Sequence, residues 1–200
     1  TWDPIRKSAG PVSGKRCTIS SFISFGYSTT SKILAIVFHS NFLYDNELNV
    51  LTQSIGLLNR LEILDLSSNK LEKIPETIGN LKKLEELDLS SNLISEIPSS
   101  IGNLTNLKNL LLGFNKLKQL PESIGNLINL ITLDLGKNKL KKIPEMVGNL
   151  INLQFLYLYY NQLASIPDSI ANLNKLEYLN LGNNELEKLG KRETIAIGNG

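Results

Sequence analysis

Apolar residues in this chain recur in a frame that repeats every 23 residues. In the segment LEILDLSSNKLEKIPETIGNL, the apolar positions are Leu61, Leu64, Leu66, Leu71, Ile74, Ile78 and Leu81. Further copies of the frame start at Leu84, Leu107, Leu130, Leu153 and Leu176. A degenerate first copy begins near Phe38. A repeat of this length predicts an elongated solenoid in which each unit packs on its neighbours.

The first half of each copy predicts a short strand followed by a turn. Leu64 and Leu66 alternate with Asp65, so the two leucines point to one side of a strand and the carboxylate to the other. Seven copies predict seven parallel strands. An asparagine follows each predicted strand, at Asn46, Asn69, Asn92, Asn115, Asn138, Asn161 and Asn184. We expect these side-chain amides to satisfy backbone groups and to form a ladder along the solenoid.

The second half of each copy predicts a helical turn. The apolar spacing changes to four and three at Ile74, Ile78 and Leu81. Pro75 is suited to the first position of this turn, and Gly79 with Asn80 is expected to end it as turn residues.

This frame resembles the 23-residue class of leucine-rich repeats, LxxLxLxxNxLxxIPxxIGNL, over residues 38–189. The resemblance implies an α/β solenoid, a right-handed horseshoe with a parallel sheet on its concave face and short helical or 3-10 segments on its convex face. Similar repeats occur in Ras-linked intracellular scaffolds and in bacterial surface or secreted proteins. Residues 1–37 are expected to be a leader or a partial cap that starts near Ile33, and residues 190–200 a non-repeat tail.

The stretch LYLYYNQL places aromatic side chains outside the predicted core. Leu156 and Leu158 take core positions, so Tyr157, Tyr159 and Tyr160 face solvent on the concave sheet and at its exit. Corresponding positions in adjacent copies form columns across the sheet. These columns add Phe155 and Tyr178 to the tyrosines and predict an aromatic hot spot for a protein partner. Cross-strand packing of the rings is the alternative explanation.

The column at the sheet exit contains both aromatic and basic residues. It runs through Phe114, Lys137 and Tyr160 in three successive copies, which places the lysine between two rings. We therefore predict that these three residues belong to the same partner-binding surface.

Acidic residues occupy the opposite end of the predicted sheet. Asp65, Glu86 and Asp88 lie on two neighbouring strands, with Asp65 directly beside Asp88, and Asp134 follows in the same column. A basic segment of the partner is the favoured ligand. A Ca²⁺ site, an acid–base pair and a plain charged surface remain as alternatives.

Lysines cluster along one edge of the middle copies. They are Lys116, Lys118, Lys137, Lys139, Lys141 and Lys142. Residues 107–142 hold seven lysines against two acids, whereas residues 61–106 hold four lysines against eight acids. The edge either contacts an acidic partner or phosphate, or is a solvated surface that discourages aggregation.

Composition excludes several classes of protein. The 200 residues carry a net charge of only +2, with no global signal for nucleic-acid binding. Cys17 is the single cysteine, so neither an intrachain disulfide nor a cysteine-based zinc site can form. His39 is the single histidine, and no catalytic triad or phosphate-binding glycine loop appears. The longest apolar run, from Ile33 to Phe38, is too short to cross a bilayer.

These observations predict a protein–protein interaction module that is not an enzyme and needs no cofactor or metal. Its partner is expected on the concave face. The alternatives are the recognition half of a larger enzyme or effector, and a Ca²⁺-dependent surface adhesin that uses Asp65 and Asp88. A homodimer through the C-terminal end, near Leu179 and Leu181, is a further possible assembly. The expected compartment is the cytoplasm or a bacterial surface or secreted setting, rather than that of a disulfide-capped eukaryotic ectodomain.

Overall fold

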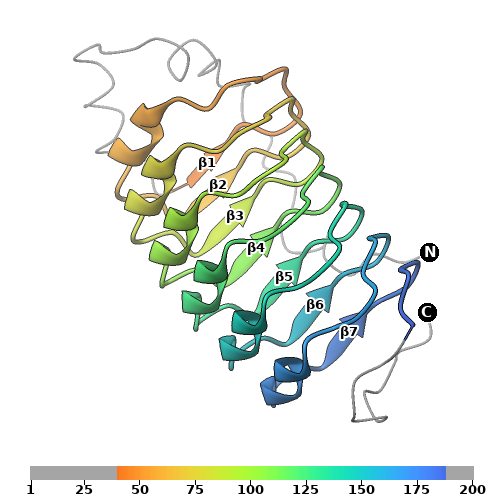
Figure 1. Ribbon diagram of the computed structural model, residues 1–200. Coiled ribbons are helices and arrows are strands. Elements are labelled where there is room, and N and C mark those ends of the chain that lie inside the picture. Colours follow the sequence, from red (N-terminus) through yellow and green to blue (C-terminus); the bar gives the residue numbers. More distant parts are fainter. Residues whose placement is uncertain (1–39, 188–200) are drawn as a thin grey trace.

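The computed structural model describes residues 40–187 as a solenoid (Figure 1). A parallel sheet forms one side and a row of 3-10 helices forms the other. The expected cap near Ile33, the residues Cys17 and His39, and the tail 190–200 lie outside the described residues.

The sheet contains one three-residue strand from each repeat. The strands are β1 (Ser40–Phe42), β2 (Ile63–Asp65), β3 (Glu86–Asp88), β4 (Asn109–Leu111), β5 (Thr132–Asp134), β6 (Phe155–Tyr157) and β7 (Tyr178–Asn180). They pair in parallel in the order of the sequence. Each residue pairs with the residue 23 positions later, as Leu64 does with Leu87. The seven-stranded parallel sheet predicted from the sequence is therefore confirmed.

The opposite side is built from five-residue 3-10 helices. They are η2 (Gln53–Leu57), η3 (Glu76–Asn80), η4 (Ser99–Asn103), η5 (Glu122–Asn126), η6 (Glu145–Asn149) and η7 (Asp168–Asn172). Pro75 precedes η3 in an extended conformation, with φ −72° and ψ 149°, so the helix starts one residue later than expected. The proline ring still fixes the entry of the chain into the helix.

The repeated glycine has a different role from the one the sequence predicts. Gly79 lies inside η3, and no described glycine has a positive φ, so turn conformation does not explain it. A Cβ atom built on Gly79 would lie 2.5 Å from the backbone oxygen of Ser100 in the next repeat. The position needs glycine because neighbouring 3-10 helices approach each other closely.

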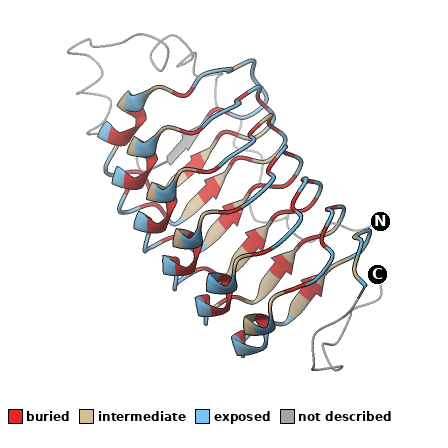
Figure 2. Ribbon diagram, in the orientation of Figure 1, coloured by how far each residue is buried: buried red, intermediate tan, exposed pale blue. Residues whose placement is uncertain are grey.

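The apolar frame forms one continuous core between the sheet and the helices. Leu64, Leu66, Leu71 and Ile78 are all fully buried. The same positions are buried in the following repeats, except that Leu181 and Leu186 of the last repeat are only partly buried. In each strand from β2 to β7, Figure 2 shows a buried central residue with a half-buried residue on either side. Stacked units thus bury one another's leucines, and no single repeat could do so alone.

The repeated asparagine forms the predicted ladder. The amide nitrogen of Asn138 donates to the carbonyl oxygens of Leu112, Leu135 and Gly136, at 2.9, 3.0 and 3.3 Å. Its amide oxygen accepts from the backbone N–H of Leu117 at 2.9 Å. Asn69, Asn92, Asn115 and Asn161 bond in the same way, and all five are buried. Each asparagine therefore links its own turn to the turn before it.

A second asparagine ladder runs on the exposed side, between the 3-10 helices and the strands. Asn106, Asn129 and Asn152 donate to the carbonyl oxygens of Lys82, Thr105 and Ile128, at 2.7 to 2.8 Å. Each of these residues makes one such bond and is solvated. This ladder therefore provides an exposed counterpart of the buried one.

Candidate functional site

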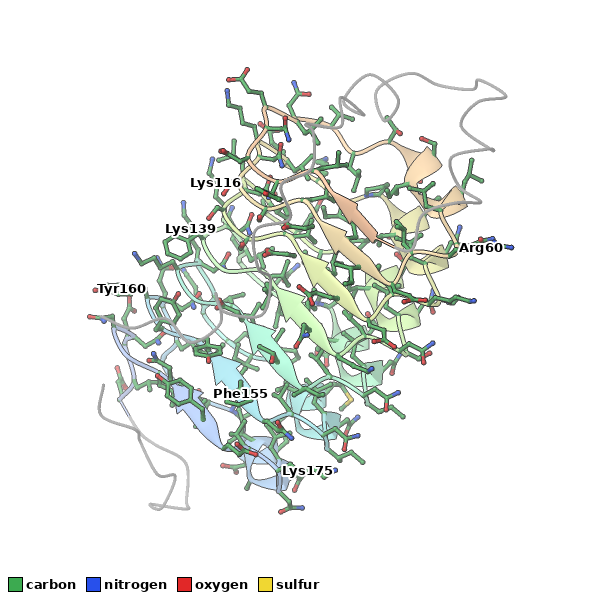
Figure 3. All side chains as sticks on the ribbon, turned by 180° about the vertical axis from the view of Figure 1, so that it is seen from behind. Arg60, Lys116, Lys139, Phe155, Tyr160 and Lys175 are labelled. Atoms are coloured by element: carbon green, nitrogen blue, oxygen red, sulfur yellow. The ribbon has the colours of Figure 1, made fainter. Side chains whose placement is uncertain are left out.

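The outward side chains of the strands form one surface, which we call the sheet face. Two columns of residues cross it from β2 to β7. The first is Ile63, Glu86, Asn109, Thr132, Phe155 and Tyr178, and the second is Asp65, Asp88, Leu111, Asp134, Tyr157 and Asn180. The register predicted from the 23-residue period is thus the observed one. Figure 3, which views this side of the molecule, labels Phe155 on β6.

Two ring pairs lie in the last two repeats, one on the sheet face and one just after β6. The rings of Tyr157 and Tyr178 are 5.1 Å apart between centroids and tilted by 42°. The rings of Tyr159 and Tyr160 are 6.1 Å apart and meet edge to face. Such geometries are favourable for aromatic pairs. Tyr160 is exposed, whereas Phe155, Tyr157, Tyr159 and Tyr178 are half-buried, so most of the predicted patch offers only part of its ring surface to a partner.

Glycine makes room for one of these rings. A Cβ atom built on Gly136 would overlap the ring of Tyr159. Glycine at position 136 therefore leaves the space that the tyrosine ring of the next repeat occupies.

The row Phe114, Lys137 and Tyr160, which we call the turn row, lies where the strands end. The ammonium nitrogen of Lys137 is 4.5 Å from the ring centroid of Phe114 and 5.3 Å from that of Tyr160. Both distances suit cation–π attraction. The predicted placement of a lysine between two rings is thus observed. Figure 3 shows Tyr160 on the same edge of the molecule as Lys116 and Lys139.

The turn row adopts a left-handed backbone conformation. Phe114, Lys137 and Tyr160 have φ values of 57°, 53° and 51°. The same turn position in other repeats holds Asp45, Ser68, Ser91 and Asn183. Bulky residues rarely adopt this region, and such outliers concentrate at functional sites. Because the two rings are also 47% and 53% exposed, the fold does not need them for its core.

We expect Phe114→Gly to raise the free energy of unfolding by about 0.5–1.5 kcal/mol. Glycine removes a left-handed strain of about 1–2 kcal/mol, while the exposed cation–π contact with Lys137 is worth about 0.5 kcal/mol. Urea denaturation measures the change, with Ser91→Gly as the matched turn variant. A loss above about 1 kcal/mol would show that the ring contact outweighs the strain.

The acidic cluster of Asp65, Glu86 and Asp88 lies at the other end of the sheet face. Burial raises the pKa of the Asp88 carboxyl above its ordinary value, and the charge of Asp65 raises it further, against hydrogen bonds with Ser90 that lower it. Burial also raises the pKa of Glu86, with smaller contributions from Asp88 and Asp65 and an opposing hydrogen bond from Asn109. The cluster is therefore an electrostatically unfavourable arrangement.

The strand-end acids also have a local structural role. Asp65 Oδ1 accepts from the backbone N–H of Ser67 at 2.9 Å, and Asp88 and Asp134 accept in the same way two residues further on. Asn180 makes the equivalent bond with Gly182 at 3.0 Å. An amide therefore serves this turn as well as a carboxylate. Across residues 40–187, no group of three or more His, Cys, Asp or Glu side chains is arranged to hold a metal ion.

The structure adds residues and conformations that the sequence patterns did not single out. Leu111 lies half-buried on the sheet face between Asp88 and Asp134. The sequence signal for it was a leucine at an outward position, in a column that otherwise holds mostly polar residues. Outside the sheet face, Ile128 and Ile151 are exposed and 23 residues apart. The identity of Phe114 did not predict its left-handed backbone conformation, because a bulky side chain sterically disfavours that region.

A family model described as a leucine-rich repeat region matches residues 32–118 and again residues 101–193. The chain belongs to the leucine-rich repeat family. Both matched ranges extend over the repeats described above, so the resemblance noted in the sequence is confirmed. No curated protein matches the chain.

Solved leucine-rich repeat structures share its fold. The ectodomain of the Arabidopsis thaliana receptor kinase GASSHO1/SCHENGEN3, in complex with CASPARIAN STRIP INTEGRITY FACTOR 2, is 34% identical with a TM-score of 0.71, over 78% of this chain and 20% of that one. The Arabidopsis receptor kinase HAESA, in complex with the peptide hormone IDA and the co-receptor SERK1, is 31% identical with a TM-score of 0.68, over 79% and 28%.

A bacterial structure is also similar. A leucine-rich repeat protein of Leptospira interrogans is 38% identical with a TM-score of 0.56, over 72% of this chain and 42% of that one. The chain therefore spans between a fifth and about two fifths of the length of these three proteins. Within residues 40–187, no helix of this leucine-rich repeat domain is long and apolar enough to span a membrane.

Proposed function

We propose that this leucine-rich repeat domain binds a protein partner on its sheet face, with the aromatic residues of β6 and β7 as the main anchor. The observation that carries the proposal is the gathering of Phe155, Tyr157 and Tyr178 on the outward side of two adjacent strands. Large rings that are partly exposed and rigidly held supply contact area at little entropic cost. The solved relatives that were determined in complex with a peptide hormone or factor agree with this function.

The turn row extends the proposed anchor. Tyr160 contacts Tyr159, and Lys137 lies between Tyr160 and Phe114. The row therefore offers a partner two exposed aromatic rings and one ammonium group beside the sheet face. Because each strand is held by its neighbours, the surface is ordered before binding, which lowers the entropic cost of association.

We expect the double variant Phe155→Ala, Tyr157→Ala to weaken partner binding at least about tenfold, the range of a hot-spot truncation. A pull-down from the lysate of the source organism, followed by titration of the recovered partner, measures the loss. The matched control is Tyr44→Ala, which removes an exposed tyrosine from the first repeat. Equal recovery of the partner by all three proteins, with unchanged melting curves, would mean that the rings only pack the sheet.

A further inference from the structure

The sheet face changes in chemistry from one end to the other. Asp65, Glu86 and Asp88 lie on β2 and β3, and Phe155 and Tyr157 lie on β6. Asn109, Leu111, Thr132 and Asp134 occupy the strands between them, so this middle part holds one carboxylate. A partner that covers the whole face therefore meets carboxylates first and aromatic rings last. This polarity specifies the partner more closely than the rings alone do.

The acidic end is unfavourable for the folded chain itself. The carboxyl groups of Glu86 and Asp88 are partly buried. The charges of Asp88 and Asp65 act on Glu86, and the charge of Asp65 acts on Asp88. The nearby ammonium of Lys108 is bonded to Glu85 at 2.8 Å, on the rim of the sheet face. An amide would serve the turn after Asp88 equally well, as Asn180 does in the same column. The carboxylates are thus not needed for the turn, and a cation on the sheet face would relieve their repulsion.

We propose that the partner is an extended polypeptide segment with two or more basic side chains, which bind Asp65, Glu86 and Asp88, and one apolar or aromatic side chain, which binds Phe155 and Tyr157. The segment crosses the strands from β2 to β6. This inference rests on the proposed function, because it describes the ligand of the same sheet face.

Strand spacing sets the distance between the two parts of the segment. Parallel strands are about 4.8 Å apart, so three steps from Asp88 to Tyr157 span about 14 Å and four steps from Asp65 span about 19 Å. An extended chain advances about 3.3 Å per residue. The basic residues should therefore lie about four to six residues from the apolar one.

The remaining charges keep a basic segment on this path. Asp134 lies directly beside Tyr157 in the same column, so one further carboxylate is placed next to the rings. Lys137, in the turn row, and Lys139 beyond it lie where the strands end and repel a basic segment that drifts toward that edge. Charge complementarity thus fixes the path as well as the composition of the ligand.

The test selects binders from a phage-displayed library of random 12-residue peptides on the full chain. We expect selected peptides to be enriched in lysine or arginine spaced four to six residues from an aromatic or large aliphatic residue. Synthetic copies of these peptides are then titrated against the wild-type chain and against two variants, Glu86→Gln with Asp88→Asn, and Tyr157→Ala. Each variant should bind at least about tenfold more weakly.

A charge-matched control separates a specific contact from a general field. Glu122→Gln with Glu145→Gln removes the same two charges from the 3-10 helices η5 and η6 and should leave the affinity within about twofold. If the peptides bind Tyr157→Ala more weakly but bind Glu86→Gln with Asp88→Asn as well as the wild type, this inference is overturned and the proposed function stands. The same holds if the selected peptides are not enriched in lysine or arginine. Peptides that bind both variants as well as the wild type, or a library without binders, would overturn both.

A second measurement shows that the Glu86→Gln, Asp88→Asn variant is folded. A raised pKa in the folded state means that the wild-type chain loses stability as the pH rises from the ordinary carboxyl range through the raised values. Asp65 on β2 lies beside Asp88 and also acts on Glu86, and Asn109 on β4 lies beside Glu86 and hydrogen-bonds to it. The ammonium of Lys108, next to Asn109, is bonded to Glu85. At neutral pH the variant should therefore melt about 1–3 °C higher than the wild type. Over the same window, the affinity of the wild type for the basic peptides should rise with pH.

Discussion

Asn138→Ala is expected to lower the free energy of unfolding by about 2–4 kcal/mol. The substitution removes three donated hydrogen bonds and one accepted bond from a buried residue. It leaves the backbone N–H of Leu117 and the carbonyl oxygen of Leu112 without this partner in the interior. An unsatisfied buried group costs about 1–3 kcal/mol, whereas a solvated one costs little. Equilibrium denaturation in guanidinium chloride measures the loss.

The exposed ladder supplies the control for this experiment. Asn129→Ala removes one bond to the carbonyl oxygen of Thr105 at a solvated position, and we expect a loss below about 1 kcal/mol. Asn138→Asp should be more damaging than Asn138→Ala at neutral pH, because it places a charge against three carbonyl oxygens. Equal losses for Asn129→Ala and Asn138→Ala would show that burial does not decide the value of these amides.

Gly125→Ala is expected to lower the free energy of unfolding by about 2–3 kcal/mol, although it adds only one methyl group. The new Cβ atom would lie 2.5 Å from the backbone oxygen of Met146 and 2.7 Å from its Cβ atom. Both atoms belong to the next 3-10 helix, so two repeats must separate to accept the methyl group. Overpacking of this kind typically costs about 1–3 kcal/mol. Thermal melting and denaturant titration both report it.

Gly182→Ala is the matched control. The nearest atom to its new Cβ would be Asn180 Oδ1 at 3.3 Å, at an exposed position with an ordinary backbone conformation. We expect a change within about 0.5 kcal/mol. Ala171 already occupies the equivalent position of η7, where it is exposed. A stable Gly125→Ala protein would mean that the helix row can widen at little cost.

The repeat period predicted those parts of the fold that depend on one spacing. Asp65 lies beside Asp88, and Phe155 beside Tyr178, because a single 23-residue frame fixes the register of every strand. The buried asparagines were predictable for the same reason, because each follows a strand at a turn whose backbone groups need the same hydrogen-bond partner in every copy. Local chemistry that recurs in every copy is thus visible in the sequence.

Features that depend on contacts between particular side chains were not predictable in this way. The role of Gly79 depends on how closely Ser100 approaches from the next repeat, which the spacing of apolar residues does not reveal. The left-handed conformation of Tyr160 is imposed by the turn and its asparagine rather than favoured by tyrosine. The half-burial of Tyr157 follows from the packing of neighbouring side chains, so the columns gave its position but not its exposed area.

The in-register stacking of the strands gives this surface an evolutionary property. Duplication or deletion of one 23-residue unit between Asp88 and Phe155 would keep every hydrogen bond of the ladder type, because each unit contacts only its neighbours. It would nevertheless move the carboxylates about 4.8 Å relative to the rings. Recombination between copies could therefore change the spacing between the basic and apolar residues of the ligand that fits this surface. The spacing would change in steps of one to two residues, and the core would stay the same.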